Sequence, residues 1–437
     1  MTSEHQRRAG QAALAGALRR AGAAALAGLF AFGAPAAASA APVRPLNEPV
    51  LSGDTVRAEQ WQLSALNLAE AWNYSDGSGV TVAVIDSGVD ANHVDLEGQV
   101  LAGVDLVDRK TDGESDPVGH GTSVSAIIAG RSDDQAGVVG IAPKAKILPV
   151  RVLDEDNKYD DSLIVAKGVR WAVDNGAKVV NLSLGGSGSS PTLAAAIDYA
   201  FAKDVVVIAC TGNATGTSTQ KNSNVGVWYP AREPGVIAVG GTERDGEGLW
   251  SGSIRGAETV VTAPATNLVG ARPDGYWRVQ GTSFAAPMVS ATAALIRSRW
   301  PDMPAGEVVN RIIRTADDRG APGRDTEFGY GLINPVAALT ADVPSVTGNP
   351  LDNTPPPGVA KFGSAPVSGQ AQSAPQESTQ PAGVPAAVPG GNVGGWAAPA
   401  KLEPTGTPAA RWIAIALFLL SAIAAAITIR RFAATTG

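Results

Sequence analysis

The fold is decided by the stretch Val80-Thr81-Val82-Ala83-Val84-Ile85, which leads into Asp86-Ser87-Gly88. Its residues are mostly apolar and β-branched, as in a strand buried on both faces of a parallel sheet. Runs of the same type follow at residues 145–153, 177–184, 205–209 and 236–239, with helix-like patterns at 162–175 and 192–203. This alternation predicts an α/β fold with a mainly parallel sheet between helices.

Reactive side chains follow these strands or begin helices. Asp86 ends the first strand, and His120 lies between two glycines just before a helix-like run at residues 124–129. Ser283 opens a long apolar helix toward Trp300. Because ligands bind beyond the carboxyl ends of parallel strands, we expect these three side chains to meet at one edge of the sheet.

An Asp, a His and a Ser together supply the groups for nucleophilic acyl transfer. A serine hydroxyl must lose its proton to a base as it attacks, and an imidazole can accept that proton and later return it. The carboxylate fixes the imidazole tautomer and stabilises its charged form. The Ser283 N–H at the helix start and the Asn213 side-chain amide are candidate donors to the developing oxyanion.

Three glycines next to these residues have expected roles. Gly119 and Gly121 are expected to leave room for a substrate backbone beside the imidazole. Gly281 is expected to let the chain turn sharply, so that Ser283 projects toward the substrate.

Three blocks resemble those of the subtilisin-like serine proteases: VAVIDSGVD at 82–90, GHGTSVSAIIAG at 119–130 and GTSFAAPMVSA at 281–291. The resemblance covers roughly residues 79–338, and it implies the three-layer fold of that family. It also implies roles for individual residues, namely Asp86 as orienting acid, His120 as general base, Ser283 as nucleophile, Asn213 as oxyanion donor, and Ser183, Leu184 and Gly185 as the substrate-binding strand.

A narrower resemblance is to the mycosins, the membrane-anchored subtilases of type VII secretion systems. It rests on Gln60-Trp61-Gln62-Leu63 ahead of Ala71-Trp72, on a Pro-rich segment and on an apolar C-terminal stretch. This resemblance implies that residues 41–71 are an extension packing on a catalytic domain at 72–340. About 30 residues are too few for a typical folded propeptide domain.

The N-terminal end resembles a secretory signal at residues 1–40. Arginines precede an apolar run at 21–32, which is too short to span a membrane. The sequence Ala38-Ser39-Ala40 then predicts cleavage after Ala40. We therefore expect the protein to be exported.

The C-terminal end predicts a tether and an anchor. Residues 341–410 contain 13 Pro and 10 Gly with six charged side chains, which predicts a disordered linker. The uncharged residues 412–429 would span about 27 Å as a helix, within a predicted transmembrane segment at 411–431. Arg430 and Arg431 favour a cytoplasmic tail at 432–437, which leaves the catalytic domain outside the cell.

Other candidate residues are expected to be structural. His93 lacks flanking glycines, and Asp90 and Asp95 are typical of turns. The acidic stretch 154–157 is expected to form a solvated turn or to line a substrate subsite, because it lacks the ligand spacing of a calcium loop. Cys210 is expected to be a small buried hydrophobe.

Composition excludes several classes of function. The net charge is −7, and no basic cluster lies outside the two ends, which argues against nucleic-acid binding. One Cys excludes an internal disulfide and any multi-Cys metal site. We expect no metal or organic cofactor to be needed for the chemistry.

The expected function is that of a membrane-anchored, extracellular serine endopeptidase that cleaves exported protein substrates. Its expected partners are those substrates, the membrane and, by resemblance to the mycosins, type VII secretion components. Two alternatives stay open. One is a chiefly structural component that stabilises a secretion complex, and the other is a tethered general or peptide-maturing subtilase.

Overall fold

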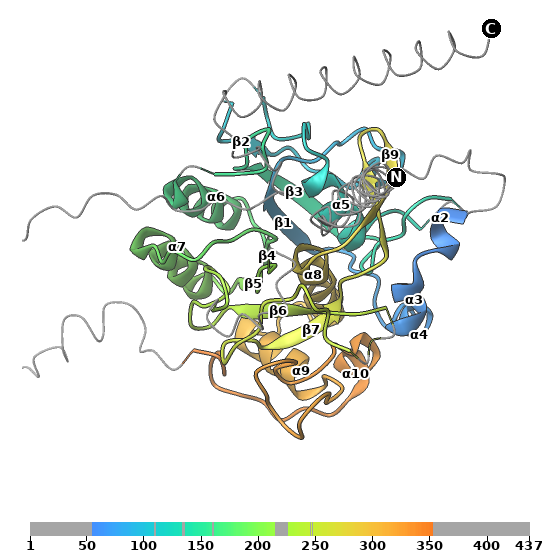
Figure 1. Cartoon of the computed structure of the whole chain (residues 1–437), viewed down its shortest axis with the longest axis vertical. Coiled ribbons are helices and arrows are strands. Elements are labelled where there is room, and N and C mark those ends of the chain that lie inside the picture. The colour runs from blue at the N-terminus through green and yellow to red at the C-terminus, as the bar shows by residue number, and fades with distance from the viewer. Residues whose placement is uncertain are drawn as a thin grey trace, which may run out of the picture. The chain divides into compact units, whose positions relative to one another are not determined.

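A seven-stranded sheet forms the centre of the computed structural model (Figure 1). The structure describes residues 55–108, 111–132, 136–159, 161–214, 226–244, 246 and 248–352. The strand order is β2-β3-β1-β4-β5-β6-β7, and every neighbouring pair is parallel. The strands are β1 (Thr81–Asp86), β2 (Val104–Asp105), β3 (Lys146–Arg151), β4 (Val179–Leu182), β5 (Val206–Cys210), β6 (Ile237–Thr242) and β7 (Val261–Pro264).

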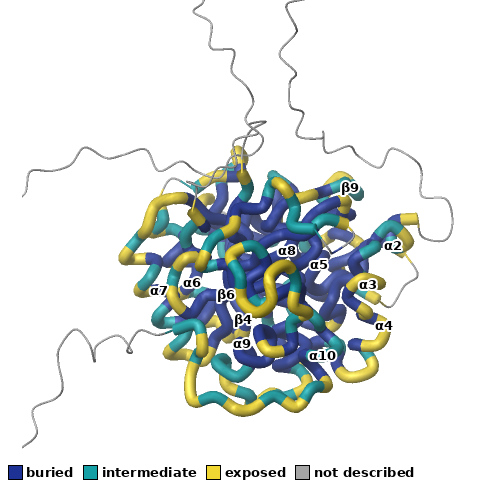
Figure 2. Tube along the Cα trace, turned by 60° about the horizontal axis from the view of Figure 1, so that its bottom comes forward, coloured by how far each residue is buried: buried dark blue, intermediate teal, exposed yellow. Residues whose placement is uncertain are grey.

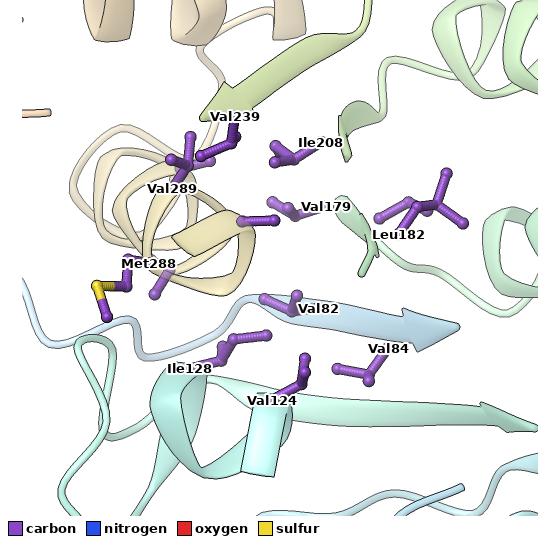
Figure 3. Packing of buried hydrophobic residues seen from close by; sticks show 14 of the residues in the cluster. Val82, Val84, Val124, Ile128, Val179, Leu182, Ile208, Val239, Met288 and Val289 are labelled. Carbon is purple, nitrogen blue, oxygen red and sulfur yellow. The ribbon is translucent and has the colours of Figure 1, made fainter. Parts of the chain in front are cut away.

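Two pairs of helices pack on the sheet. One pair is α5 (His120–Ala129) with α8 (Thr282–Arg299), and the other is α6 (Ser162–Asp174) with α7 (Pro191–Ala202). Helix α8 is buried along most of its length, and Figure 3 shows its Val289 next to Val239 of β6, with Met288 on another side of the helix. Figure 2 shows the buried residues gathered in the middle, with exposed residues on the outer loops. A helix that is apolar all round fits this central place.

The smaller elements surround this core. They are α2 (Thr55–Ala58), α3 (Trp61–Ala65), α4 (Leu68–Ala71), the 3-10 helix η1 (Val94–Leu96), α9 (Ala305–Arg314), α10 (Pro335–Thr340) and the antiparallel hairpin of β8 (Leu268–Arg272) and β9 (Gly275–Val279).

The predicted α/β fold with a mainly parallel sheet is confirmed. The five apolar runs are β1, β3, β4, β5 and β6, and the two helix-like patterns are α6 and α7. The prediction that a helix follows His120 at 124–129 was wrong in its start, because α5 begins at His120 itself. Gly119 precedes it with φ +81°, a left-handed conformation that a glycine adopts without strain.

The segment before the sheet lies against the rest of the domain. The side chain of Gln60 forms two hydrogen bonds with the backbone of Val139, one in each direction and both 2.9 Å long. The Trp61 and Trp72 indoles donate to the carbonyls of Thr266 and Ile141, at 3.1 and 2.8 Å. Both tryptophans therefore serve as packing anchors with one polar contact each.

The predicted start of the linker, at residue 341, was wrong. Residues up to Asp352 are described, and they lie against the domain. Asn349 donates its side-chain amide to the carbonyl of Gly235 at 2.8 Å, and Gly235 N–H donates to the Leu351 carbonyl at 3.1 Å. Asn310 also donates to the Pro344 carbonyl at 2.9 Å. High Pro and Gly content does not prevent packing where backbone groups find partners.

Several predicted segments fall outside the described residues: the signal at 1–40, the first part of the extension at 41–54, the remaining linker from residue 353, the transmembrane segment at 411–431 and the tail at 432–437. Within the described part of the chain, no helix has the length and apolar character needed to cross a membrane.

Candidate active site

The strand order reverses at β1, and Asp86 is its last residue. The Asp86 carboxylate is fully buried, and its Oδ1 lies 2.7 Å from His120 Nδ1. Because an ionised carboxylate can only accept hydrogen bonds, Nδ1 carries the proton. The backbone N–H of Ser87 also donates to Asp86 Oδ1, at 2.8 Å. The imidazole is therefore held in a single tautomer at the start of α5.

A second carboxylate, which the sequence analysis missed, holds the first turn of α5. Asp116 Oδ1 accepts from Gly119 N–H at 2.8 Å and from Ser87 Oγ at 2.9 Å. Its Oδ2 accepts from the backbone and the hydroxyl of Thr122, at 2.8 and 2.7 Å. A negative side chain at a helix N-terminus satisfies orphan N–H donors and complements the helix dipole. Asp116 thus fixes the turn that carries His120.

The expected role of two glycines was wrong. A side chain at Gly119 would lie 3.0 Å from Cγ of Arg272, and one at Gly121 would lie 2.0 Å from the Gly88 carbonyl oxygen. Both positions face protein atoms. These glycines let α5 approach the loop after β1 and the β8–β9 hairpin closely, and they do not leave room for substrate.

Ser283 is the second residue of α8. Its hydroxyl and the side-chain amide of Asn213 both lie close to one point. That point is where a Cβ on Gly281 would lie, 3.2 Å from Ser283 Oγ and 3.4 Å from Asn213 Nδ2. Gly281 has φ +145°, so a side chain there would also strain the backbone. The ring of Phe284, the next residue, lies 5.2 Å from the His120 ring, centroid to centroid. The Ser283 and His120 segments are therefore adjacent.

Asn213 follows β5, and its orientation is fixed by the start of α8. Its Oδ1 accepts from Thr282 N–H at 3.0 Å and from Thr282 Oγ1 at 2.9 Å. This pairing assigns the carbonyl and the amino group of the side chain, because both Thr282 groups donate to it. Nδ2 is consequently the donor of this side chain, and it lies 3.4 Å from the Cβ point beside Gly281.

A chain of buried hydrogen bonds ends at the backbone carbonyl of Ser283. Two of its members, Asn181 and Ser290, were missed in the sequence analysis. The Ser290 hydroxyl donates to Asn181 Oδ1 at 2.8 Å, and Asn181 Nδ2 donates to Ser183 Oγ at 2.9 Å. The Ser183 hydroxyl then donates to the carbonyl of Ser283 at 2.7 Å. The four residues are at most 1% exposed. The only signal in the sequence was a polar Asn within the apolar run at 177–184.

Residues 183–185, which were expected to bind the substrate, come immediately after β4. Ser183 points its side chain inward, to Ser283, and Leu184 is buried. The Leu184 carbonyl lies 3.8 Å from the Cys210 thiol, and Gly185 lies close to Trp228 and Tyr229. Their role toward a substrate stays a prediction.

The alternative candidates have structural partners of their own. His93 accepts a hydrogen bond from Asp95 N–H at 3.2 Å and contacts the Tyr276 ring edge-on. Asp154 closes a turn by accepting from Asp156 and Lys158 N–H, both at 2.9 Å. Burial raises the pKa of the Cys210 thiol to about 12, so that it stays neutral. Among the described residues, no group of three His, Cys, Asp or Glu side chains is placed to hold a metal ion.

This site combines an Asp–His pair, a serine at a helix start and a side-chain amide at the carboxyl ends of parallel strands. Such a site defines a serine hydrolase of the α/β class. The sequence profile of the Subtilase family (Peptidase_S8) matches residues 77–331. The chain therefore belongs to the subtilase family.

Known proteins give the same assignment. Subtilisin DY of Bacillus licheniformis is 36% identical over 298 residues, which are 67% of this chain and 98% of that protein. Fervidolysin of Fervidobacterium pennivorans is 36% identical over 336 residues, 68% of this chain but only 46% of its own length. The crystal structure of MycP1 from the ESX-1 type VII secretion system aligns with a TM-score of 0.59 at 30% identity, covering 69% of this chain and 91% of that one. Mycosins are thus among its structural neighbours.

Proposed function

We propose that this chain is an active serine endopeptidase and that it acts at the outer face of a cell membrane as a mycosin. The observation that carries the catalytic part is the buried Asp86–His120 hydrogen bond of 2.7 Å beside a serine and an amide that border one point. Each group then has one task in the hydrolysis of a peptide bond through an acyl-enzyme.

His120 is the general base. Its Nδ1 is engaged by Asp86, so Nε2 is the nitrogen that accepts the proton of the Ser283 hydroxyl during attack on the scissile carbonyl. The imidazolium is stabilised by the adjacent carboxylate, and it returns the proton to the leaving amine as the acyl-enzyme forms. A water molecule then repeats the sequence and releases the acid.

Asn213 and the start of α8 stabilise the tetrahedral intermediate. The Asn213 side chain is oriented in advance by Thr282, so its Nδ2 donor needs no reorganisation when the carbonyl oxygen becomes negative. The backbone N–H of Ser283 lies in the first turn of α8, where N–H groups have no partner within the helix. Two donors can therefore converge on one oxygen.

The membrane location is supported by the sequence alone. A predicted secretory signal at 1–40 and an apolar stretch at 411–431 flanked by arginines favour a single-pass protein with its catalytic domain outside. The structural similarity to MycP1 of a type VII secretion system supports secretion components as partners and exported proteins as substrates.

The enzymatic part is tested by the Ser283→Ala variant. Hydrolysis of unfolded casein should fall by roughly 10⁶-fold, the size of the loss when a subtilisin loses its nucleophile. Ser298→Ala is a matched control on the same helix, because its hydroxyl donates to the Ser78 carbonyl far from the site, and it should keep full activity. Residual hydrolysis by Ser283→Ala within tenfold of the wild type would refute the assignment.

The secretion part needs a separate comparison in the native host. A Ser283→Ala allele that blocks export through the type VII system would tie export to proteolysis. Normal export with Ser283→Ala, but none after deletion of the gene, would assign the chain a structural role in the secretion complex.

A further inference from the structure

The Trp228 side chain contacts two backbone segments that flank the site. One segment follows β4 at residues 183–185, and the other follows β5 at residues 211–213. A Cβ on Gly212 would lie 2.3 to 2.7 Å from carbons of the Trp228 ring, so the ring lies directly on the Gly212 backbone. A Cβ on Gly185 would lie 3.3 Å from Trp228 Cβ. Both segments therefore meet the same side chain.

Trp228 is held in this place by the segments themselves. Its backbone N–H donates to the Thr211 carbonyl at 3.0 Å. The next residue, Tyr229, exchanges two backbone hydrogen bonds with Gly186, at 2.8 and 2.9 Å. The backbone of Trp228 and Tyr229 is thus bonded to the segments that follow β4 and β5. A shift of the Trp228 backbone away from the site would break these bonds.

A substrate must place one residue in the same region. Its scissile carbonyl has to reach both Ser283 Oγ and Asn213 Nδ2, which border the point beside Gly281. If the peptide pairs as a strand with residues 183–185, the residue that supplies this carbonyl lies between that segment and Asn213. Its side chain then points toward Gly185 and Gly212, both of which contact the Trp228 side chain.

The size of the indole decides which side chains fit there. No side chain can pass between the Trp228 ring and the Gly212 backbone, because they are already in contact. A large side chain would need the indole to move, which overpacking penalises, whereas a side chain of one or two heavy atoms has little to displace.

We infer that Trp228 is a specificity-determining residue that restricts the position before the scissile bond to small side chains, such as those of Ala, Ser and Gly. This inference rests on the proposed endopeptidase function and names the class of substrate for the same site. Each methylene group added or removed in such a subsite changes kcat/KM by about 10- to 200-fold.

The test uses internally quenched peptides that differ only at this position, with Ala, Leu or Phe. The wild type should cleave the Ala peptide with kcat/KM at least tenfold above that for Phe. In Trp228→Ala the ratio of kcat/KM for the Ala peptide to that for the Phe peptide should fall by at least tenfold. Trp228→Phe should give an intermediate ratio. Trp171→Ala is the control, because Trp171 lies on α6 and packs away from these segments.

Labelling by a small fluorophosphonate counts competent active sites in each preparation, which separates two kinds of failure. A labelled wild type that prefers Phe or Leu, or a labelled Trp228 variant with an unchanged ratio, would overturn the specificity inference and leave the proposed function intact. No labelling and no cleavage by the wild type would overturn the proposed function and this inference with it. If Trp228→Ala does not fold, the ratio in the wild type and in Trp228→Phe still decides.

Discussion

At the scale of single residues, the Asp86 carboxylate accepts hydrogen bonds from the groups around it. His120 Nδ1–H and Ser87 N–H converge on its Oδ1 at 2.7 and 2.8 Å. With an asparagine side chain at this position, the amide Nδ2 would face the His120 Nδ1–H, donor against donor, unless the imidazole changed to the other tautomer. The geometry of the site would survive while its chemistry would not.

Asp86→Asn is therefore expected to lower kcat by about 10⁴-fold, the loss seen when the orienting Asp of a serine protease becomes Asn. The measurement is steady-state hydrolysis of the Ala peptide, with circular dichroism to verify the fold. Asp90→Asn is the control, since the Asp90 side chain accepts from Asn92 N–H in a turn. Activity of Asp86→Asn within tenfold of the wild type would remove Asp86 from the proposed mechanism.

Ser290 tests whether the buried hydrogen-bond chain positions the nucleophile. Ser290→Ala removes the donor to Asn181 Oδ1 and leaves that buried acceptor unpaired. We expect the free energy of unfolding to fall by about 1 to 3 kcal/mol, and kcat to fall several-fold with KM unchanged. Reduced stability with an unchanged kcat would show that the chain supports the fold alone.

The sequence predicted the reactive residues of the site better than their supports. Asp86, His120 and Ser283 carry reactive groups at strand ends or helix starts, so their types and places identify them. Asn181 and Ser290 lie more than a hundred positions apart in two apolar runs, and only the packing of α8 on β4 brings them together. Gly119 and Gly121 were recognised as necessary, but the atoms that they face belong to the β8–β9 hairpin, which was not predicted, and to the loop after β1.

At the scale of elements, the segment α2 to α4 depends on a few polar contacts. The Gln60 side chain is 2% exposed and pairs with both backbone groups of Val139. Because these groups are buried, each would be left without a partner if the amide were removed.

Gln60→Ala is accordingly expected to lower the free energy of unfolding by roughly 2 kcal/mol or more, measured by urea denaturation. The neighbouring Ser64 is exposed, so Ser64→Ala should change stability by less than about 0.5 kcal/mol. Equal stabilities of the two variants would contradict an anchoring role for Gln60. Fluorophosphonate labelling at Ser283 should be the same in both, because the contact is to the loop after α5.

Elements with continuous apolar runs were predictable, and short or polar ones were not. Strands β1, β3, β4, β5 and β6 are buried on both faces, so their sequences carry a strong signal. Strand β7 is four residues long and ends in Pro264, and β9 is only half-buried along most of its length. Such strands exist because a neighbouring strand pairs with them, which a local pattern does not show.

At the scale of the whole molecule, the catalytic domain should be separable from its proposed anchor. The domain extends to Asp352, because Asn349 and Leu351 bond to Gly235 and Leu351 packs against the core. This boundary lies beyond the expected one at residue 340, since the contacts involve residues distant in sequence.

In the native host, the full chain should sediment with the membrane fraction, whereas a chain ending at Asp352 should be released in active form. A chain ending at Thr340 should be released too, but with a Tm lower by several degrees, because it lacks the contacts to Gly235 and Asn310. A released full chain would contradict the anchor, and equal Tm values would contradict the extended domain boundary.

The central claim is that Ser283 is a nucleophile activated by His120 and Asp86. The most direct measurement is mass spectrometry of the full chain after reaction with a fluorophosphonate, followed by digestion to locate the adduct. We predict one adduct per molecule, on Ser283, that is absent in Ser283→Ala and strongly slowed in His120→Ala. An adduct on another residue, or equal labelling of the wild type and Ser283→Ala, would contradict the account.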